Sequence, residues 1–318
     1  MNMKVLIPQD IAAEGKKYLL DRGYEIKMGS GITTEILKEE VEDCDAILAR
    51  TAILSREVLE AGKKLKVISR YGVGVDNIDI RAAKELGIYV TNAPLGNVVS
   101  VAEQTIGFII ACSRNFVKCN KELRNGDYEL RNKFLGSDLE GKVLGVIGLG
   151  KIGTKVAKKA TLGLDMKVVG FDPYVKREQI TPEIELASDL GYLLENSDFI
   201  SMHVPTTEET REMMGKNEFK MMKETAYFIN CARGEVVNED ALFEALVQKE
   251  IAGAALDVFN PEPPLKDNKL FELDNVLVTP HNAGLTRESV VRVAIDAAKG
   301  IDEVLTGKKP SWPVASPD

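Results

Sequence analysis

Arg233, Glu262 and His281 each follow closely after a predicted strand, and those strands are successive in the chain. Parallel strands end at one edge of a sheet, where open α/β sheets bind ligands, so we expect the three side chains to converge. A guanidinium binds a carboxylate bidentately and polarises a neighbouring carbonyl. An imidazolium donates a proton, and a carboxylate beside it orients the ring and favours its charged form. Each member of this trio could singly be an ordinary surface or loop residue, but their shared position predicts a proton-transfer site.

A glycine-rich loop upstream fits the pattern G-x-G-x-x-G and lies between an apolar strand and a helical segment. In that setting the first glycine permits the tight turn, and the second lets the backbone approach a pyrophosphate. The third allows close helix–strand contact, and the helix N-terminus offers free N–H groups to phosphates. The loop residues expected to bind a dinucleotide are Gly148, Gly150, Lys151, Ile152 and Gly153.

Asp172 ends the next predicted strand, 19 residues after Gly153. A carboxylate there accepts hydrogen bonds from the ribose hydroxyls and repels a 2′-phosphate, which favours NAD over NADP. Lys176 and Arg177 lie close by and weaken that preference. NAD beside the trio predicts reduction of a 2-oxo acid by hydride transfer, or oxidation of a 2-hydroxy acid in reverse.

The chain has only two histidines, so His203 is the alternative proton donor. It also ends a predicted strand, but that strand follows the ribose-binding one and is expected nearer the adenosine half of the cofactor. Val204 and Pro205, which come next, are expected to line the cofactor. Cys231 is interpreted as a small packing residue near the cofactor and not as a nucleophile, because no adjacent histidine could activate it.

Short apolar runs alternate with amphipathic, helix-length segments along the chain, which is typical of βαβ units and doubly wound parallel sheets. Two series of strands are expected, at 4–7, 25–28, 46–49, 67–69 and 89–91, and then, as a set of six, at 143–147, 167–171, 199–203, 226–230, 253–257 and 276–279. A long helical pattern over 98–126 separates the series. A final helix at 287–305 is expected to pack back on the first series.

The predicted fold class is therefore α/β, with two doubly wound parallel-sheet domains. A Rossmann NAD-binding domain at 99–285 is inserted in a discontinuous, flavodoxin-like substrate domain made of 1–98 and 286–318. A second glycine-rich turn, 71–76, could cradle an anion with its N–H groups or simply connect a strand to a helix.

Composition excludes several classes of protein. The formal net charge of −8 argues against binding to nucleic acid. The four cysteines are scattered, with no C-x-x-C pair, so neither a metal site nor a disulfide scaffold is expected. No apolar run approaches the length of a membrane span, and the N-terminus enters an apolar strand directly, without a signal-peptide pattern. A cytoplasmic protein without membrane partners is expected.

Several segments, in the same order, resemble the D-isomer-specific 2-hydroxyacid dehydrogenase family over nearly the whole chain. They are 70–77, 97–103, 148–153, 230–238, 257–264 and 279–284. The resemblance implies that the trio is catalytic and that the N–H groups of Val73 and Gly74 hold the substrate carboxylate. It also implies nicotinamide contacts for Asp257 and Cys231, and a homodimer formed largely through the NAD-binding domains. Further residues assigned to the cofactor are Val101, Ala232, His281 and Gly284, and Asn97 and Arg233 are assigned to the substrate.

Within the family, the resemblance is strongest to members that act on 3-phosphoglycerate. Arg50, Arg70 and either Arg131 or Lys133 match basic residues that meet the substrate phosphate there, the last pair from across the dimer. The chain ends at 318, so no C-terminal regulatory domain is expected. The segment 282–285 departs from that branch, which leaves hydroxypyruvate, glyoxylate or another 2-oxo acid open as the substrate. A non-enzymatic, NAD-sensing corepressor of the same fold is a further alternative.

Overall fold

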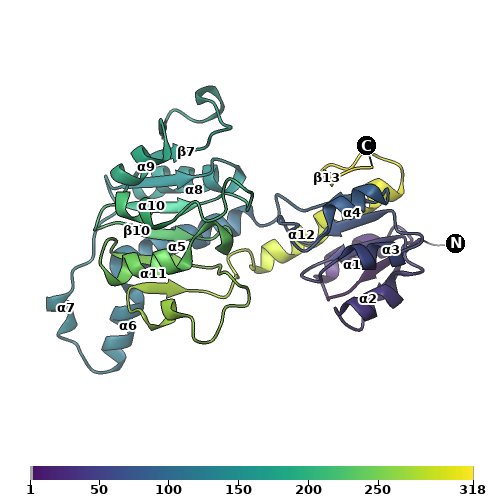
Figure 1. The fold of residues 1–318 in the computed structure, drawn as a ribbon, viewed down its shortest axis with the longest axis horizontal. Coiled ribbons are helices and arrows are strands. Elements are labelled where there is room, and N and C mark those ends of the chain that lie inside the picture. The colour runs from purple at the N-terminus through teal and green to yellow at the C-terminus, as the bar shows by residue number, and fades with distance from the viewer. Residues whose placement is uncertain (1–2, 318) are drawn as a thin grey trace. The chain divides into compact units, whose positions relative to one another are not determined.

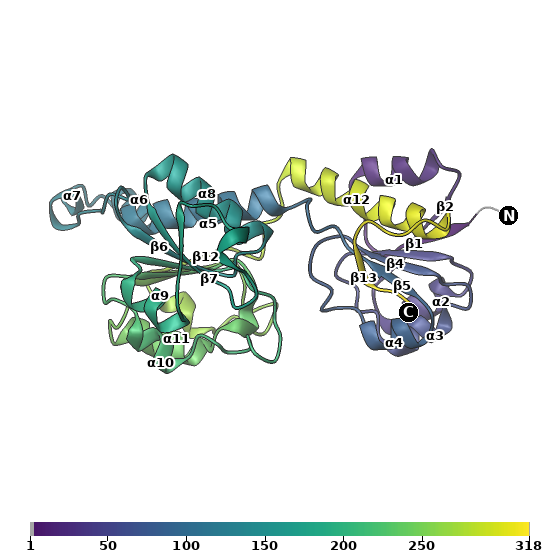
Figure 2. The ribbon, with the colours of Figure 1, turned by 90° about the horizontal axis from the view of Figure 1, so that it is seen from above.

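The computed structural model describes residues 3–317. The chain divides into two compact units, which we call unit 1 (Met1–Val98 with Gly284–Asp318) and unit 2 (Val99–Ala283). Each unit is a mainly parallel sheet with helices on both faces (Figure 1, Figure 2). The chain leaves unit 2 two residues before the boundary predicted from the sequence. The two doubly wound α/β domains predicted from the sequence are thus confirmed.

The sheet of unit 1 has the strand order β5-β4-β3-β1-β2, which is the flavodoxin-like arrangement. Its switch point lies between β1 and β3, where successive connections leave in opposite directions. The parallel strands are β1 (Lys4–Ile7), β2 (Glu25–Met28), β3 (Ala46–Ala49), β4 (Val67–Arg70) and β5 (Tyr89–Thr91). A strand that the sequence analysis missed, β13 (Pro313–Ala315), pairs antiparallel with β5 at the edge of this sheet.

Helices cover both faces of this sheet (Figure 2). On one face lie α1 (Ala13–Leu20) and α12 (Arg287–Leu305), and on the other lie α2 (Thr34–Val41), α3 (Arg56–Ala61) and α4 (Ile80–Glu85). The C-terminal helix packs on unit 1 as expected: Tyr24 Oη donates a 2.9 Å hydrogen bond to Asp302, and Tyr71 Oη donates one of 2.8 Å to the carbonyl of Val290.

The sheet of unit 2 has seven parallel strands in the order β8-β7-β6-β9-β10-β11-β12, which extends the Rossmann order by one strand. They are β6 (Val143–Ile147), β7 (Lys167–Phe171), β8 (Ile184–Leu186), β9 (Phe199–Met202), β10 (Tyr227–Asn230), β11 (Gly253–Leu256) and β12 (Val276–Val278). The expectation of six strands was wrong because β8 was missed. This edge strand has three residues and pairs only with β7, so no apolar run marks it in the sequence.

The long helical pattern at 98–126 is broken in two. Asn115 adopts a left-handed conformation with φ of 51°, which ends α5 (Val98–Arg114) before α6 (Phe116–Arg124) begins. Neither α6 nor α7 (Leu130–Lys133) has a buried residue. The remaining helices of unit 2 are α8 (Lys151–Leu164), α9 (Leu190–Asn196), α10 (Lys216–Met221) and α11 (Glu239–Val247). Across residues 3–317, no helix combines the length and apolar character needed to cross a membrane.

The contact between α1 and α12 is close enough to test by a single substitution. A Cβ atom at Gly15 would lie 2.7 Å from Cβ of Ala294 and 2.8 Å from its carbonyl oxygen, so the helices must separate. We expect Gly15→Ala to lower the free energy of unfolding of unit 1 by about 1–3 kcal/mol, measured by native-state hydrogen exchange.

Gly163→Ala is the matched control, because nothing lies within 4 Å of a Cβ atom at that position in α8. It should raise helix stability by about 0.5–1 kcal/mol. Equal protection of unit 1 in the wild type and in Gly15→Ala would contradict the close packing of the two helices.

Candidate functional site

The glycine loop after β6 admits no side chain at two of its three glycines. A Cβ atom at Gly153 would lie 1.9 Å from the carbonyl oxygen of Gly148, and one at Gly148 would lie 2.6 Å from that of His203. Gly148 also has φ of 93°, in the region that favours glycine. At Gly150, by contrast, a Cβ atom would meet nothing within 4 Å. The loop is therefore closely packed at Gly148 and Gly153 and open at Gly150.

That opening lies at the N-terminus of α8, which no side chain caps. Backbone N–H groups at such a helix end bind phosphate oxygens. Asp172 lies beside the loop, where its Oδ2 accepts a 2.9 Å hydrogen bond from Leu149 N–H and its Oδ1 accepts one of 2.9 Å from Tyr174 N–H. Each carboxylate oxygen keeps a second lone pair for a ribose hydroxyl. The open glycine, the uncapped helix and the fixed carboxylate fit a dinucleotide.

The two basic residues near Asp172 differ in what they can do. The guanidinium of Arg177 donates to the carbonyls of Ile184 and Pro182, so it is held against the start of β8. The side chain of Lys176 is exposed. A guanidinium fixed in this way is not poised for a 2′-phosphate, which strengthens the preference for NAD drawn from Asp172.

His203 follows β9 directly beneath the glycine loop. Its N–H donates to the carbonyl of Ile147 at 2.7 Å, and its Nε2 lies 2.8 Å from Oγ of Ser201. Burial lowers the pKa of His203 to about 3, so the ring is neutral near pH 7 and cannot act there as an imidazolium donor. Val204 packs against Gly148, and Pro205 is exposed beyond it.

The loops after β10 and β11 approach each other closely at Gly234, where a Cβ atom would lie 1.9 Å from the carbonyl oxygen of Phe259. Asn230, at the end of β10, donates through Nδ2 to the carbonyl of Arg233 at 2.8 Å and accepts from Ala232 N–H at 2.9 Å. These contacts fix the turn that carries Arg233 against the loop that carries Glu262. The sequence analysis missed Asn230, although it stands in the quoted segment.

Glu262 and His281 are in direct contact. Nδ1 of His281 lies 2.7 Å from Oε2 of Glu262, and Oε1 of Glu262 accepts a 3.0 Å hydrogen bond from Phe259 N–H. Burial by itself would raise the pKa of Glu262, but the His281 ring, Phe259 N–H and the charge of Arg233 outweigh it and hold that pKa below its usual value. The carboxylate is therefore ionised at neutral pH. With Nδ1 engaged and half of the His281 side chain exposed, Nε2 is the nitrogen that a ligand can reach.

Asp257 determines the shape of the turn that carries His281. It is fully buried, and its oxygens accept from Thr279 Oγ1 at 2.5 Å, Asn282 N–H at 2.9 Å and Ala283 N–H at 2.8 Å. Its carbonyl accepts from His281 N–H at 2.8 Å. His281 itself has φ of 49°, an uncommon conformation for a residue with a side chain, and these four bonds hold it there. Thr279, to which the sequence analysis assigned no role, is the first residue of the segment 279–284 quoted there.

The apolar residues assigned to the cofactor lie in or against the cores of unit 2. Val101 and Cys231 belong to one buried cluster, and Ala232 packs against another. Burial raises the pKa of the Cys231 thiol to about 12, which agrees with its interpretation as a packing residue.

In unit 1, Arg50 and Arg70 lie at neighbouring strand ends, because Ala49 of β3 is in register with Arg70 of β4. Arg50 donates to the carbonyl of Asp10 at 3.0 Å across the switch point of the sheet. Asn77, another residue that the sequence analysis missed, joins the two ends: it accepts from Arg70 Nε at 3.2 Å and donates to the carbonyl of Ala52 at 2.7 Å. Two cationic side chains thus share one edge of this sheet with the turn that carries Val73 and Gly74.

Of the remaining predicted residues, Asn97 and Gly284 belong to unit 1, and Arg131 and Lys133 belong to unit 2. Gly284 packs against Asn97, whose Oδ1 is buried and accepts no hydrogen bond within residues 3–317. Arg131 is exposed on α7, where it donates to Tyr128 Oη at 2.8 Å, and Lys133 lies 3.7 Å from Asp127. Within the same range, no group of three or more His, Cys, Asp or Glu side chains could hold a metal ion.

Comparison with known proteins identifies the family to which the chain belongs. Residues 106–283 match the D-isomer specific 2-hydroxyacid dehydrogenase family, NAD binding domain. D-3-phosphoglycerate dehydrogenase of Methanocaldococcus jannaschii is 42% identical over 96% of this chain, which covers 58% of that protein. Hydroxypyruvate reductase of Thermotoga maritima is 40% identical over 85% of this chain and 89% of that protein.

Among solved structures, D-lactate dehydrogenase of Aquifex aeolicus complexed with NAD and lactic acid superposes with a TM-score of 0.88 and 30% identity, over 99% of this chain and 100% of that one. The chain therefore belongs to the D-isomer specific 2-hydroxyacid dehydrogenase family, and residues 106–283 are its NAD-binding domain. It spans just under three-fifths of the length of the phosphoglycerate dehydrogenase that it resembles.

The contact between Glu262 and His281 makes a prediction that does not depend on activity. In His281→Ala the carboxylate stays partly buried but loses the imidazole, so the pKa of Glu262 should rise, as measured by NMR titration of 13C-labelled glutamate. A depressed pKa stabilises the fold above the unfolded-state value and loses that effect as the pH falls through the folded-state value. The variant should therefore lose less stability than the wild type on acidification.

Glu244 is the internal control for this titration, because Lys216, far from the site in sequence, holds its pKa low. Its pKa should be the same in both proteins. An unchanged pKa of Glu262 would show that the imidazole does not stabilise the carboxylate.

Proposed function

We propose that the protein is an NAD-dependent dehydrogenase that interconverts D-2-hydroxy acids and 2-oxo acids. The observation that carries the proposal is the Glu262–His281 pair, with Nε2 exposed and Arg233 close enough to affect the carboxylate. NAD bound with its pyrophosphate at the glycine loop would supply or accept the hydride through its nicotinamide ring.

The chain's own residues account for binding and proton transfer. Arg233 pairs with the substrate carboxylate and polarises the adjacent carbonyl, and Val73 and Gly74 hold the carboxylate through their N–H groups. In the reductive direction, protonated His281 gives the proton on Nε2 to the carbonyl oxygen as the carbonyl carbon gains hydride. Glu262 remains ionised throughout and accepts the hydrogen bond from Nδ1, which orients the ring and directs Nε2 to the substrate. In the oxidative direction, neutral His281 takes the hydroxyl proton through the same nitrogen.

Replacing His281 or Arg233 of the trio should separate turnover from cofactor binding. We expect His281→Ala and Arg233→Ala to lower kcat/KM for a 2-oxo acid by about 10²–10⁴-fold, because each removes a group that acts on the substrate. The dissociation constant for NADH, measured by fluorescence titration, should change little, since the glycine loop is untouched.

His203→Gln is a control in which the other histidine is replaced, and its proton-transfer step should survive because that ring is neutral and enclosed. Near-full activity of His281→Ala would refute the role of His281. Absence of oxidoreductase turnover in the wild type, together with NAD-dependent oligomerisation, would instead favour a corepressor-like protein.

For the substrate we propose 3-phosphoglycerate and its oxidation product, 3-phosphohydroxypyruvate. The proposal is supported by the two arginines at one sheet edge of unit 1 and by the names of the relatives at about 40% identity. A cationic edge on a net-acidic protein suits a doubly anionic substrate. Hydroxypyruvate is the alternative, because the relative named for it matches over most of its own length.

A panel of 2-oxo acids tests the phosphate contact. We expect Arg50→Gln to raise KM for 3-phosphohydroxypyruvate by about tenfold or more while KM for glyoxylate, which has no distal group, changes little. Arg81→Gln is the matched control, because Arg81 is 88% exposed and pairs with Glu85 one helical turn away. Equal kcat/KM of the wild type for glyoxylate and for 3-phosphohydroxypyruvate would refute the proposed phosphate contact.

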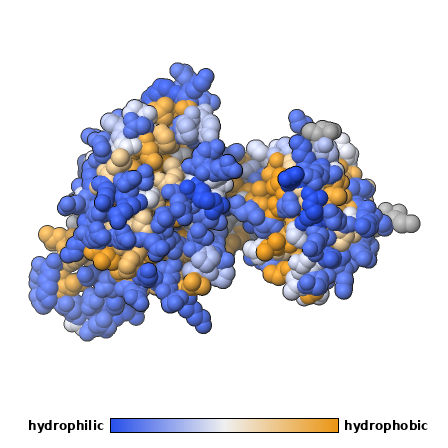
Figure 3. All heavy atoms as spheres, in the orientation of Figure 1, coloured by the Kyte–Doolittle hydropathy of each residue, from blue (hydrophilic) through white to orange (hydrophobic). Residues whose placement is uncertain are grey.

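We also propose that the protein is a homodimer formed through unit 2. The segment 116–135, which we call the arm, contains α6 and α7 and has five large apolar side chains in water: Phe116, Val117, Leu123, Tyr128 and Leu135, which are between 50% and 86% exposed. Figure 3 shows apolar residues on the surface over this part of unit 2. Apolar surface of this kind, on helices without a buried residue, is typical of an interface with a second copy. Arg131 lies on the arm, in keeping with its predicted role across the dimer.

Introducing charged side chains on the apolar surface of the arm should separate the subunits. We expect the double variant Phe116→Lys, Leu135→Lys to sediment as a monomer at micromolar concentration, while the wild type sediments as a dimer, because lysines cannot be buried unpaired. Leu20→Lys, at a 57% exposed position on α1 of unit 1, should leave the dimer intact. A monomeric wild type would refute the proposal.

A further inference from the structure

The turn that carries Val73 and Gly74 is held from one side by the segment that follows β5. The carbonyl of Gly72 accepts a 2.9 Å hydrogen bond from Ala93 N–H. The carbonyl of Val73 accepts one of 2.7 Å from Nδ2 of Asn92. Two successive carbonyls of the turn are thus bound by two successive residues of one neighbouring segment.

Because the peptide bond is planar, these two contacts also determine which way the N–H groups on the opposite side of the turn point. In a trans peptide the carbonyl and the N–H of the next residue point in opposite directions. The Gly72 carbonyl therefore fixes the direction of Val73 N–H, and the Val73 carbonyl fixes that of Gly74 N–H. Both N–H groups face away from Asn92, and within residues 3–317 neither has an acceptor.

We propose that Asn92 is a positioning residue for substrate recognition, because its side-chain amide fixes the peptide plane that presents Gly74 N–H to the substrate carboxylate. The proposal rests on the proposed function, in which Val73 and Gly74 hold that carboxylate. Asn92 itself touches neither substrate nor cofactor in this scheme.

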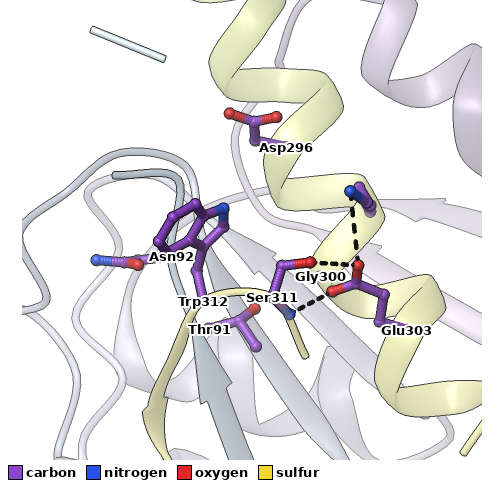
Figure 4. A pocket seen from close by; sticks show the side chains of 8 residues that line it. Thr91, Asn92, Asp296, Gly300, Glu303, Ser311 and Trp312 are labelled. Carbon is purple, nitrogen blue, oxygen red and sulfur yellow. Dashed lines mark hydrogen bonds and ion pairs between the residues drawn. The ribbon is translucent and has the colours of Figure 1, made fainter. Parts of the chain in front are cut away.

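The amide can play this part because the backbone of Asn92 is held independently. Its N–H donates to the carbonyl of Trp312 at 3.3 Å, next to the pairing of β5 with β13. The preceding Thr91 is buried and donates through Oγ1 to Ser69 at 2.9 Å. In Figure 4, the amide of Asn92 points away from α12 while Ser311 and Glu303 face each other on the other side of Trp312. The C-terminal segment therefore supports the strand end from which Asn92 reaches the turn.

The chemistry of the side chain matters as much as its place. A carbonyl acceptor needs a donor, and the amide provides one without charge. Asn92→Ala would leave the Val73 carbonyl without its hydrogen-bond donor. The peptide between Val73 and Gly74 could then rotate, and Gly74 N–H would no longer keep one direction. Aspartate has the same shape but no donor when ionised, so it would repel the Val73 carbonyl and turn the peptide away.

Steady-state kinetics with 2-oxo acids of different tails test the proposal. We expect Asn92→Ala to raise KM about tenfold for glyoxylate, hydroxypyruvate and 3-phosphohydroxypyruvate alike, because all share the carboxylate. kcat should stay within about threefold, and the dissociation constant for NADH should not change, since proton and hydride transfer are untouched. Asn92→Asp should raise KM further than Asn92→Ala.

Thr33→Ala is the matched control for destabilisation of unit 1. It removes the side-chain cap of α2, in which Thr33 accepts from Ile36 N–H, without touching the turn, so it should lower thermal stability but leave every KM unchanged. KM values within twofold of the wild type in both Asn92 variants would overturn the proposal, as would a rise confined to the phosphorylated substrate. Absence of turnover in the wild type would instead refute the proposed function.

Discussion

The 2.7 Å contact between Nδ1 of His281 and Oε2 of Glu262 is the interaction on which the proposed catalytic site depends. It joins residues from two different loops, so both loops must be held before the contact can form. Gly234 allows the loops after β10 and β11 to approach, and Asp257 ties down the turn that carries the histidine. The carboxyl ends of the strands bring the two loops to one side of the sheet, and these contacts hold the side chains in the positions that the proposed proton transfer needs.

The two histidines show how environment separates residues of the same type. His203 is enclosed beneath the glycine loop and neutral, whereas His281 is half exposed and beside an ionised carboxylate. Of the two, only His281 combines an exposed ring with a carboxylate partner on Nδ1, which is the arrangement that the proposed proton transfer uses. The acidic net charge of the chain likewise gives weight to the few places where arginines gather, such as the shared ends of β3 and β4.

Much of this fold is visible in the sequence because buried parallel strands are continuous apolar runs. β1, β2, β3 and β5 have the predicted bounds, and so does α12. β8 and β13 were missed because each is a three-residue edge strand without a continuous apolar β-branched run: β8 is Ile-Glu-Leu and β13 begins with proline, whereas the edge strand β12 is Val-Leu-Val. The break at Asn115 depends on one left-handed residue inside an otherwise helical pattern. Thr279, Asn77 and Asn92 were missed for another reason: their bonds join segments distant in sequence, and no spacing rule shows such bonds.

The division of unit 1 into two stretches of chain has a consequence for its synthesis. One face of its sheet, with Val5, Ile7 and Val67, packs against Val293, Ala297 and Ile301 of α12. The strands leave the ribosome first, and the helix that covers them follows only after all of unit 2 has been made. During that interval the face is exposed apolar surface on a partly formed sheet, which is the kind of surface that chaperones bind and that aggregates. The order of the chain thus makes unit 2 complete before unit 1 can be, although unit 1 begins first.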